Sequence, residues 1–464
     1  MSQTARSRGE SQRPSVNFSR NTHRYSRGDW VKLNKSNTSS PRRTKQLADF
    51  IKSTLLDNDG ALKLGRKHRP DYRLPVIMLV LSLVGLVVLF SIIPAISGGD
   101  DKVANVYMIK QVLFLVAGIA AFFAAGQIPL DWWRKHGNKV FLFGLIICLA
   151  LPILGALKIP IASCKLGACR WYAISGLSFQ PAEILKLGLL FVMASMLACQ
   201  ASKNRLSSLE TLLKFFTIML IVMVVIAGLQ KDLGTALALM AIMLTQLIIS
   251  GISWRYIGYI LGSAVAMGVV SIIVAPHRLE RVATFFGNGN AATDYHINQA
   301  MIAIGSGGLM GRGLGKSVQA FGWLPEAVND SIFAIIAEML GFIGVVALLG
   351  AFVYLLKIIL EKIDYTENYY LRLVVAGVFG WLGSHVVLNI GAMTHIIPLT
   401  GITLPFVSFG GTSMICSMFG LGIVFAISRY VSHRRFNSVK EKKGEDSLRR
   451  RGQRWSHYAN SSRY

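Results

Sequence analysis

The hydrophobic pattern of the chain is a series of long apolar segments separated by mostly short polar connections. A helix needs about 20 mainly apolar residues to cross the hydrocarbon core of a bilayer. Ten segments meet this requirement, with approximate bounds 74–97, 110–129, 140–157, 184–200, 215–230, 233–253, 256–275, 332–356, 371–391 and 403–428. The sequence therefore predicts an all-α polytopic membrane protein with ten transmembrane helices.

Basic residues gather at the two ends of the chain. Residues 1–73 hold 17 Lys/Arg against 6 Asp/Glu and residues 429–464 hold 11 against 3, so the tails carry +11 and +8 of the total +26. Further Lys and Arg lie in the short connections 130–139, 201–214, 254–255 and 357–370. Because Lys and Arg are enriched in cytoplasmic connections, both termini are predicted to be cytoplasmic. The long connections 158–183 and 276–331 then face outward, and the second, between spans 7 and 8, is the larger.

Composition divides the chain into three parts. Hydrophobic residues make up 53% and charged residues 16%, whereas soluble proteins carry about 25% charged residues. We expect a disordered basic cytoplasmic tail at 1–73, a ten-helix membrane domain at 74–430 and a second basic cytoplasmic tail at 431–464. Basic tails beside membrane spans are typical of attraction to anionic lipids, so we expect membrane lipids and no nucleic acid as their partners. No cleaved signal peptide is expected.

Two of the five cysteines stand apart from the apolar segments. Cys164 and Cys169 lie in "SCKLGACRW", in the first long outward connection, where a disulfide can persist. A zinc site would need two further soft ligands nearby, and the sequence shows none there. A disulfide and a pair of thiols are both compatible with this pattern.

Several carboxylates near the outward ends of the spans are candidate functional groups, because charges at membrane depth are costly and usually serve a function. They are Glu183, Asp232, Glu326, Asp330 and Glu338. Glu183 and Lys186 are one helical turn apart, so they can pair. Each acid alone is compatible with a structural ion pair or a helix cap, but together they predict a polar site that opens outward. His385, in the ninth span, is interpreted as a satisfied histidine of the bundle.

The segment from Tyr295 to Asp330 is long, polar and rich in glycine. Its "GRGLGKS" resembles a phosphate-binding loop, but Met310 stands where the first glycine is required, and the outward location is wrong for a nucleotide. We therefore reject that interpretation. The glycines can let the backbone approach a ligand closely, or they can serve close helix packing or a flexible loop.

Five motifs occur in order along residues 74–430: "CRWYAISGLSFQPAEILKLGLLF", "QKDLGTALAL", "YHINQAMIAIGSGGLMGRGLGKS", "WLPEAVNDSIFAIIAEMLGFIG" and "HIIPLTGITLPFVSFGGTSM". With ten spans around them, the chain resembles the SEDS family (shape, elongation, division and sporulation) of peptidoglycan polymerases, most closely its cell-division branch. The resemblance implies a glycosyltransferase that polymerises lipid II, the undecaprenyl-diphosphate-linked disaccharide-pentapeptide. It places the enzyme at the outer face of the bacterial cytoplasmic membrane, at the division septum.

The resemblance also implies partners, namely a class B penicillin-binding protein, which is a transpeptidase, and other proteins of the division machinery. No cofactor is required, because the lipid diphosphate is already activated, although a divalent cation stays open. Two alternatives belong to other classes: a lipid II flippase or other transporter, and a non-catalytic scaffold of the division machinery. A transporter would be expected to place its ionisable groups near the bilayer midplane.

The family's catalytic acid lies in a "DP-x-G-x-G-Y" context, which "RVATFFGNGNAATDYHINQ" lacks. Asp294, directly before Tyr295, is the best candidate for the general base. Asp232 in "QKDLG", where Lys231 replaces the family's proline, is the alternative base or a metal or hydroxyl ligand. The resemblance and the outward carboxylates together suggest these substrate contacts: Arg170, Glu183, Lys186, Arg281, Gln299, Ser306, Gly307, Gly308, Glu326, Asp330, Glu338, Ser408, Gly410 and Gly411. No metal ligand is assigned.

Overall fold

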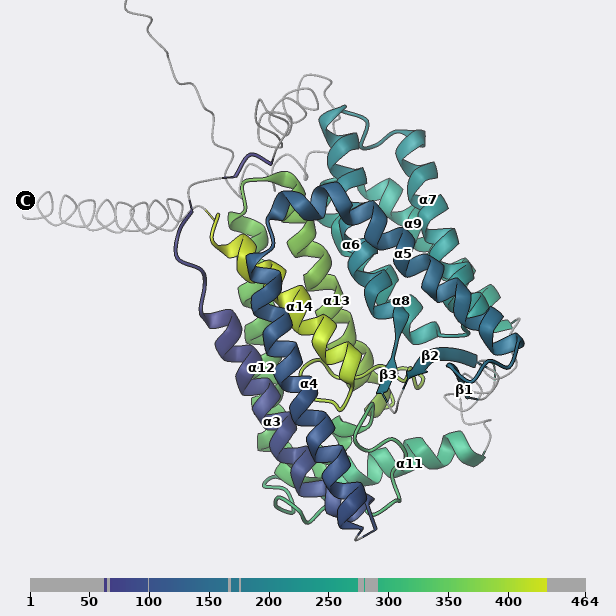
Figure 1. Cartoon of the computed structure of the whole chain (residues 1–464), viewed down its shortest axis with the longest axis vertical. Helices are drawn as coiled ribbons and strands as arrows, with labels where there is room; N and C mark the ends of the chain where they lie inside the picture. The colour runs from purple at the N-terminus through teal and green to yellow at the C-terminus, as the bar shows by residue number, and fades with distance from the viewer. Residues whose placement is uncertain are drawn as a thin grey trace, which may run out of the picture. The chain divides into compact units, whose positions relative to one another are not determined.

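The computed structural model describes residues 62–64, 67–98, 100–165, 168–174, 177–273, 279 and 291–431 (Figure 1). Most of the two predicted tails lies outside these residues. The helices are α3 (Arg73–Ile96), α4 (Asp101–Gln127), α5 (Leu130–Ala156), α6 (Pro181–Ser202), α7 (Leu209–Met223), α8 (Leu233–Ser250), α9 (Trp254–Ile273), α11 (Ala291–Ser306), α12 (Ile332–Tyr365), α13 (Tyr369–Met393) and α14 (Gly411–Ser428). A π-helical segment, η1 (Val224–Leu229), continues α7.

The predicted helical membrane fold is confirmed. Nine of the described helices are long and apolar enough to cross a bilayer, and α9 is apolar over Trp254–Val270. Each of the ten predicted segments overlaps one of these ten helices. Helix α11 is a further helix, in the long connection before α12, and it runs across the direction of the others (Figure 1).

Several predicted boundaries are wrong. Residues 130–139, predicted as a loop, form the first turns of α5, and α12 continues to Tyr365 through most of the predicted loop 357–370. An apolar pattern marks only the part of a helix inside the hydrocarbon, and a helix can continue past it with charged side chains in water. Conversely, residues 403–410 are not helical, because Pro405 lacks a backbone donor and Phe406 has a positive φ of 66°.

The first long connection forms a small antiparallel sheet, which the all-α prediction missed. Strands β1 (Ala162–Lys165), β2 (Ala168–Ile174) and β3 (Leu177–Phe179) pair in the order β1-β2-β3. Cys164 lies opposite Cys169, and the two are joined in a disulfide. Such short strands give too few alternating positions to be read from the sequence.

The glycine-rich connection packs tightly against a kink in α12. Gly341 has a non-helical conformation with a φ of 67°, which interrupts the hydrogen bonding of the helix. The backbone amides of Arg312 and Gly313 donate to the carbonyls of Glu338 and Met339 at 2.9 and 3.0 Å. A Cβ atom at Gly311 would collide with the carbonyl of Met339. Glycine is therefore required here for packing of the backbone against α12.

Glu338 completes this packing from inside the helix. Its fully buried carboxylate accepts hydrogen bonds from Ser317 Oγ at 2.5 Å, from the Val318 amide at 2.9 Å and from the Gln319 amide at 3.3 Å. Arg312 Nε lies 3.9 Å away. Glu338 therefore holds the connection in place.

We expect Glu338→Ala to lower the free energy of unfolding by about 2–4 kcal/mol, because two backbone amides and a hydroxyl lose their acceptor in a buried place. Thermal unfolding in detergent measures the change. Glu326→Ala is the control, since its exposed carboxylate accepts one hydrogen bond, from Asn329. Equal stability of the two variants would contradict the role of Glu338.

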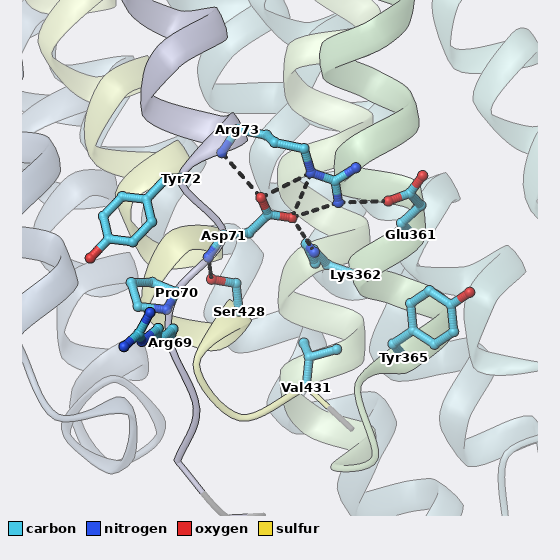
Figure 2. Close-up of a pocket in the computed structure, with 10 residues that line it drawn as sticks. All are labelled: Arg69, Pro70, Asp71, Tyr72, Arg73, Glu361, Lys362, Tyr365, Ser428 and Val431. Atoms are coloured by element: carbon cyan, nitrogen blue, oxygen red, sulfur yellow. Dashed lines mark hydrogen bonds and ion pairs between the residues drawn. The ribbon is translucent and has the colours of Figure 1, made fainter. Parts of the chain in front are cut away.

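A second joint connects the segment before α3 to the ends of α12 and α14 (Figure 2). The carboxylate of Asp71 accepts hydrogen bonds from Arg73 Nη2 at 2.7 Å and is 2.5 Å from Lys362 Nζ. The Asp71 amide donates to Ser428 Oγ at 3.0 Å, and Arg73 also binds Glu361 at 3.0 Å. This joint lies where both predicted cytoplasmic tails meet the bundle.

Burial acts to raise the pKa of Asp71, but hydrogen bonds from Arg73 and Lys362 outweigh it and hold that pKa well below its usual range. A carboxylate with a lowered folded pKa stabilises the protein above its unfolded pKa, near 4, and loses this contribution as pH falls. We expect Asp71→Asn to cost about 1.5–3 kcal/mol at neutral pH. Chemical unfolding across a pH series should show the difference from wild type shrinking below about pH 4. A difference that stays constant would contradict this.

Candidate active site

A polar cavity of about 470 Å³ lies where the small sheet meets the beginnings of α6, α8 and α14 and the segment before α12. Eight of the predicted site residues line it: Arg170, Glu183, Lys186, Asp232, Glu326, Asp330, Gly410 and Gly411. They come from five separate stretches of sequence. The fold thus brings four predicted carboxylates to one place, together with Arg170 and Lys186, the two predicted basic contacts that the structure describes.

Several helix N-termini meet at this cavity. Gln180, the N-cap of α6, Asp232, the N-cap of α8, and Gly410, the N-cap of α14, all line it. Asp330 lines it directly before Ser331, the N-cap of α12. Each N-terminus presents unpaired amides and about half a positive charge. The surroundings therefore favour an anion such as a phosphate.

Lys186 is the centre of a buried polar cluster at the cavity wall. Pro181 starts α6, so Glu183 and Lys186 fall in its first turns, three residues apart on one face. Lys186 Nζ donates to Glu183 Oε1 at 2.8 Å and lies 3.0 Å from Nε2 of His385 on α13. It also lies 5.3 Å from the ring centroid of Trp381. Lys186 and Glu183 are 1% and 2% exposed.

The contacts of His385 fix its tautomer. An ammonium group can only donate and a carbonyl can only accept. Since Nε2 faces Lys186 and Nδ1 lies 3.3 Å from the carbonyl of Thr403, we assign the ring proton to Nδ1. His385 is thus a neutral acceptor that orients Lys186 and ties α13 to the segment before α14.

One carboxylate oxygen in this cluster lacks a partner. Glu183 Oε2 is buried and has no hydrogen-bond partner among the described residues. Glu183 lines the cavity. An unsatisfied buried acceptor costs about 1–3 kcal/mol, so it indicates a group that ligand binding would supply.

Asp232 also faces the cavity, but both of its oxygens are engaged. Oδ1 accepts from the Thr235 amide at 3.1 Å, and Oδ2 accepts from Thr235 Oγ1 at 2.8 Å and from Gln180 Nε2 at 3.3 Å. The first two bonds make Asp232 the cap of α8. A carboxylate has about four acceptor positions, so Asp232 can still accept one further hydrogen bond from a substrate.

The other two predicted acids that line the cavity, Glu326 and Asp330, lie in the segment before α12. Asn329 Nδ2 donates to Glu326 Oε2 at 2.5 Å. Asn389 on α13 donates to the carbonyls of Asp330 and Ile402, both at 2.7 Å. Asn389 therefore ties this segment to the one before α14.

Six predicted contacts do not line the cavity that the described residues enclose: Gln299, Ser306, Gly307, Gly308, Glu338 and Ser408. Ser306 Oγ donates to the Ala303 carbonyl, and Ser408 Oγ accepts from the Leu404 amide, closing a turn. A Cβ at Gly307 would collide with the Ala337 carbonyl. Ser408 and Gly307 therefore serve the local fold of the backbone. Asp294 lies in α11, but its side chain is outside the described part, as is all of Arg281.

Sequence reasoning missed His385 as part of the site. Trp381, His385 and Asn389 are all buried and four residues apart on α13, so they form one row. That row of non-aliphatic side chains in an apolar helix was the available signal. Gln180, Thr403 and Trp171 also line the cavity and were missed.

No group of three or more His, Cys, Asp or Glu side chains in the described part of the chain is arranged to hold a metal ion. The described residues thus offer no preformed site for the divalent cation left open above, and we derive no step through one.

Comparison with known proteins shows the family to which this chain belongs. The model of the cell cycle protein family FtsW/RodA/SpoVE matches residues 72–433. The chain belongs to the FtsW/RodA/SpoVE family. This confirms the SEDS resemblance.

Relatives of the FtsW/RodA/SpoVE family match most of the chain. A probable peptidoglycan glycosyltransferase FtsW of Coxiella burnetii is 30% identical over 374 residues, which is 76% of this chain and 95% of the relative. Stage V sporulation protein E of Bacillus subtilis is 30% identical over 376 residues, 79% of this chain and 98% of the relative.

Solved structures of the family agree in fold. A chain of a peptidoglycan synthase complex, described as coordinating polymerization and crosslinking, aligns with a TM-score of 0.63 at 25% identity, covering 78% of this chain and 98% of that chain. The rod shape determining protein RodA of Thermus thermophilus aligns with a TM-score of 0.57 at 26% identity, covering 78% and 98%. The protein is therefore a multi-pass membrane protein with a RodA-like fold.

We expect Lys186→Met to lower the free energy of unfolding by about 3–5 kcal/mol, because it leaves the buried Glu183 carboxylate without its cation. The double variant Glu183→Gln/Lys186→Met removes both charges and should be more stable than the single variant. Thermal unfolding of wild type, Glu183→Gln, Lys186→Met and the double variant in detergent measures this cycle. A double variant as unstable as the sum of the single ones would show that the pair is not coupled.

Proposed function

We propose that this protein is a peptidoglycan glycosyltransferase that polymerises lipid II at the outer face of the bacterial cytoplasmic membrane during cell division. The relatives named as peptidoglycan glycosyltransferases support this. The observation that carries it is the buried, unpartnered Glu183 Oε2 beside Lys186, in a cavity where several helix N-termini meet. An acceptor next to a region that attracts anions suits a sugar hydroxyl beside a diphosphate.

The reaction forms one glycosidic bond and breaks one sugar–phosphate bond. The C4 hydroxyl of one lipid II attacks the anomeric carbon of the growing strand, and undecaprenyl diphosphate leaves. A carboxylate takes the hydroxyl proton, which contributes about 10²–10⁴-fold. We assign this role to Asp294 from the motif order, with Asp232 as the alternative. Lys186 and the amides at the helix N-termini stabilise the charge that develops on the departing diphosphate.

The positions of the ionisable groups favour polymerisation over transport. Glu183 and Lys186 lie in the first turns of α6, Asp232 caps α8 and Asp330 directly precedes α12. They therefore lie at the ends of the spans, whereas a transporter is expected to hold its substrate near the midplane. The cavity also borders the sheet and the loops, where a long polymer could leave.

The partner in this proposal is a class B penicillin-binding protein, working with other proteins of the division machinery at the septum. Support comes from the likeness to the peptidoglycan synthase complex, which coordinates polymerization and crosslinking. A polymerase that hands its strand directly to a transpeptidase would need its cavity on the same membrane face as the transpeptidase domain, as the predicted orientation provides.

Purified full-length protein with its transpeptidase partner and fluorescent lipid II tests the proposal by gel separation of the products. We expect Asp294→Asn to lower the polymerisation rate by about 10²–10⁴-fold, since a base is lost. Glu183→Gln should lower it about tenfold or more, since a charged hydrogen bond to substrate is weakened. Glu361→Gln, in the distant Asp71 joint, is the control and should match wild type.

Each other result has a defined meaning. Full activity of Asp294→Asn together with an inactive Asp232→Asn would move the base to Asp232. Movement of fluorescent lipid II across vesicle membranes without polymer would indicate a transporter. Neither polymer nor movement, in a protein that still binds the transpeptidase, would indicate a scaffold.

A further inference from the structure

The small sheet supplies much of the wall of the cavity. Ser163, Arg170, Trp171, Ala173 and Ser178 all line it. The connection that forms the sheet has only three short strands, so its place relative to the helices depends on a few contacts. Those contacts therefore decide where the wall of the cavity stands.

The sheet is held against α5 at two points. The disulfide between Cys164 and Cys169 packs against Gly155, where a Cβ atom would collide with Cys169 Sγ and lie 2.8 Å from Cys164 Sγ. Tyr172 Oη donates to the carbonyl of Ile147 at 2.9 Å. The disulfide thus fixes the free end of the hairpin and seats it on the end of α5.

Arg170, the residue after Cys169, extends from the hairpin to the turn before α8. Its Nη2 donates to the carbonyl of Lys231 at 2.5 Å, and its Nε donates to the carbonyl of Gln230 at 3.3 Å. These bonds use the planar fork of arginine, which can bind two neighbouring carbonyls at once. Arg170 was predicted to contact substrate, but two of its donors are engaged by the backbone.

The turn that Arg170 holds is strained and directly precedes Asp232. Lys231 has a φ of 56°, a left-handed conformation that side chains other than glycine rarely adopt. Such a conformation persists only where its surroundings enforce it. The next residue, Asp232, caps α8 and faces the cavity. The bonds from Arg170 therefore help to set the direction of the Asp232 carboxylate.

We propose that the Cys164–Cys169 disulfide is a positioning element of the active site, which acts through Arg170 on the Gln230–Lys231 turn and so on Asp232. Its effect on catalysis rests on the proposed function, whereas its effect on the turn does not.

Reduction of the disulfide takes up two electrons and two protons and leaves two thiols. A phosphine supplies the two electrons when it is oxidised to the phosphine oxide, and the water molecule that provides the oxygen supplies the two protons. Cys164 is exposed, so such a reductant reaches it.

The cysteine content makes the test selective. All five cysteines lie in the described part of the chain, and Cys148, Cys199 and Cys416 are free. A reductant therefore changes one bond. The proteins to compare are wild type, Cys164→Ala/Cys169→Ala, Arg170→Gln and the control Cys199→Ala, each full-length in lipid nanodiscs and each with and without a water-soluble phosphine.

The first measurement is hydrogen exchange of peptides covering residues 230–236, with residues 332–338 as the internal reference. We expect reduction of wild type, the double cysteine variant and Arg170→Gln each to raise exchange in 230–236 about tenfold, since its fixed geometry is lost. The exchange of the reference peptide should be the same in all of these proteins. The exchange of residues 230–236 in Cys199→Ala before reduction should equal that of oxidised wild type. The phosphine should have no further effect on the double cysteine variant or on Arg170→Gln.

The second measurement is the polymerisation of fluorescent lipid II with the transpeptidase partner. We expect reduction to lower kcat about tenfold and to leave KM within about twofold, because misplacing a group acts on the transition state. Unchanged exchange on reduction overturns the inference whatever the activity. A raised KM with unchanged exchange in Arg170→Gln would assign Arg170 to direct diphosphate binding. Absence of polymer from wild type would refute the proposed function. The hydrogen exchange of residues 230–236 would then by itself test whether the disulfide positions the turn.

Discussion

The arrangement of the cavity depends on the burial of one ammonium group. Lys186 is 1% exposed, and taking such a charge out of water costs several kcal/mol unless acceptors surround it. Glu183 on its own helix and His385 on α13 supply them, and Trp381 adds the face of its ring. Because these groups must meet, α6 and α13 are held in one register, and His385 extends the constraint to the segment before α14 through Thr403.

The features that the sequence predicted well are local ones. The length of each apolar segment indicates a span, and the spacing of Glu183 and Lys186 indicates a pair on one helical face. Features that depend on tertiary contacts could not be predicted in this way. His385 is 199 residues from Lys186, and no pattern within either helix shows that they meet. Likewise, nothing near Glu338 reveals that the amides of Val318 and Gln319, about 20 residues earlier in the chain, donate to its carboxylate.

The rule that buried polar groups need partners separates the predicted acids by role. Glu338 accepts three hydrogen bonds from one connection, so its capacity serves the fold. Asp232 serves both the fold and the cavity, because it caps α8 and also faces the cavity. Glu183 has a buried oxygen without a partner among the described residues. Three carboxylates that are alike in sequence context thus differ in what they still require, and only the structure distinguishes them.

Charge balance explains how so polar a cavity is tolerated at the end of an apolar bundle. Among the described residues that line it, four are carboxylates and only Arg170 and Lys186 are cationic. The helix N-termini that meet there each contribute about half a positive charge, which offsets much of the remaining deficit. The positive contributions come largely from backbone and from side chains already held in place. A diphosphate would therefore meet fixed dipoles that need no rearrangement, and fixed dipoles are the most effective stabilisers of charge that develops during a reaction.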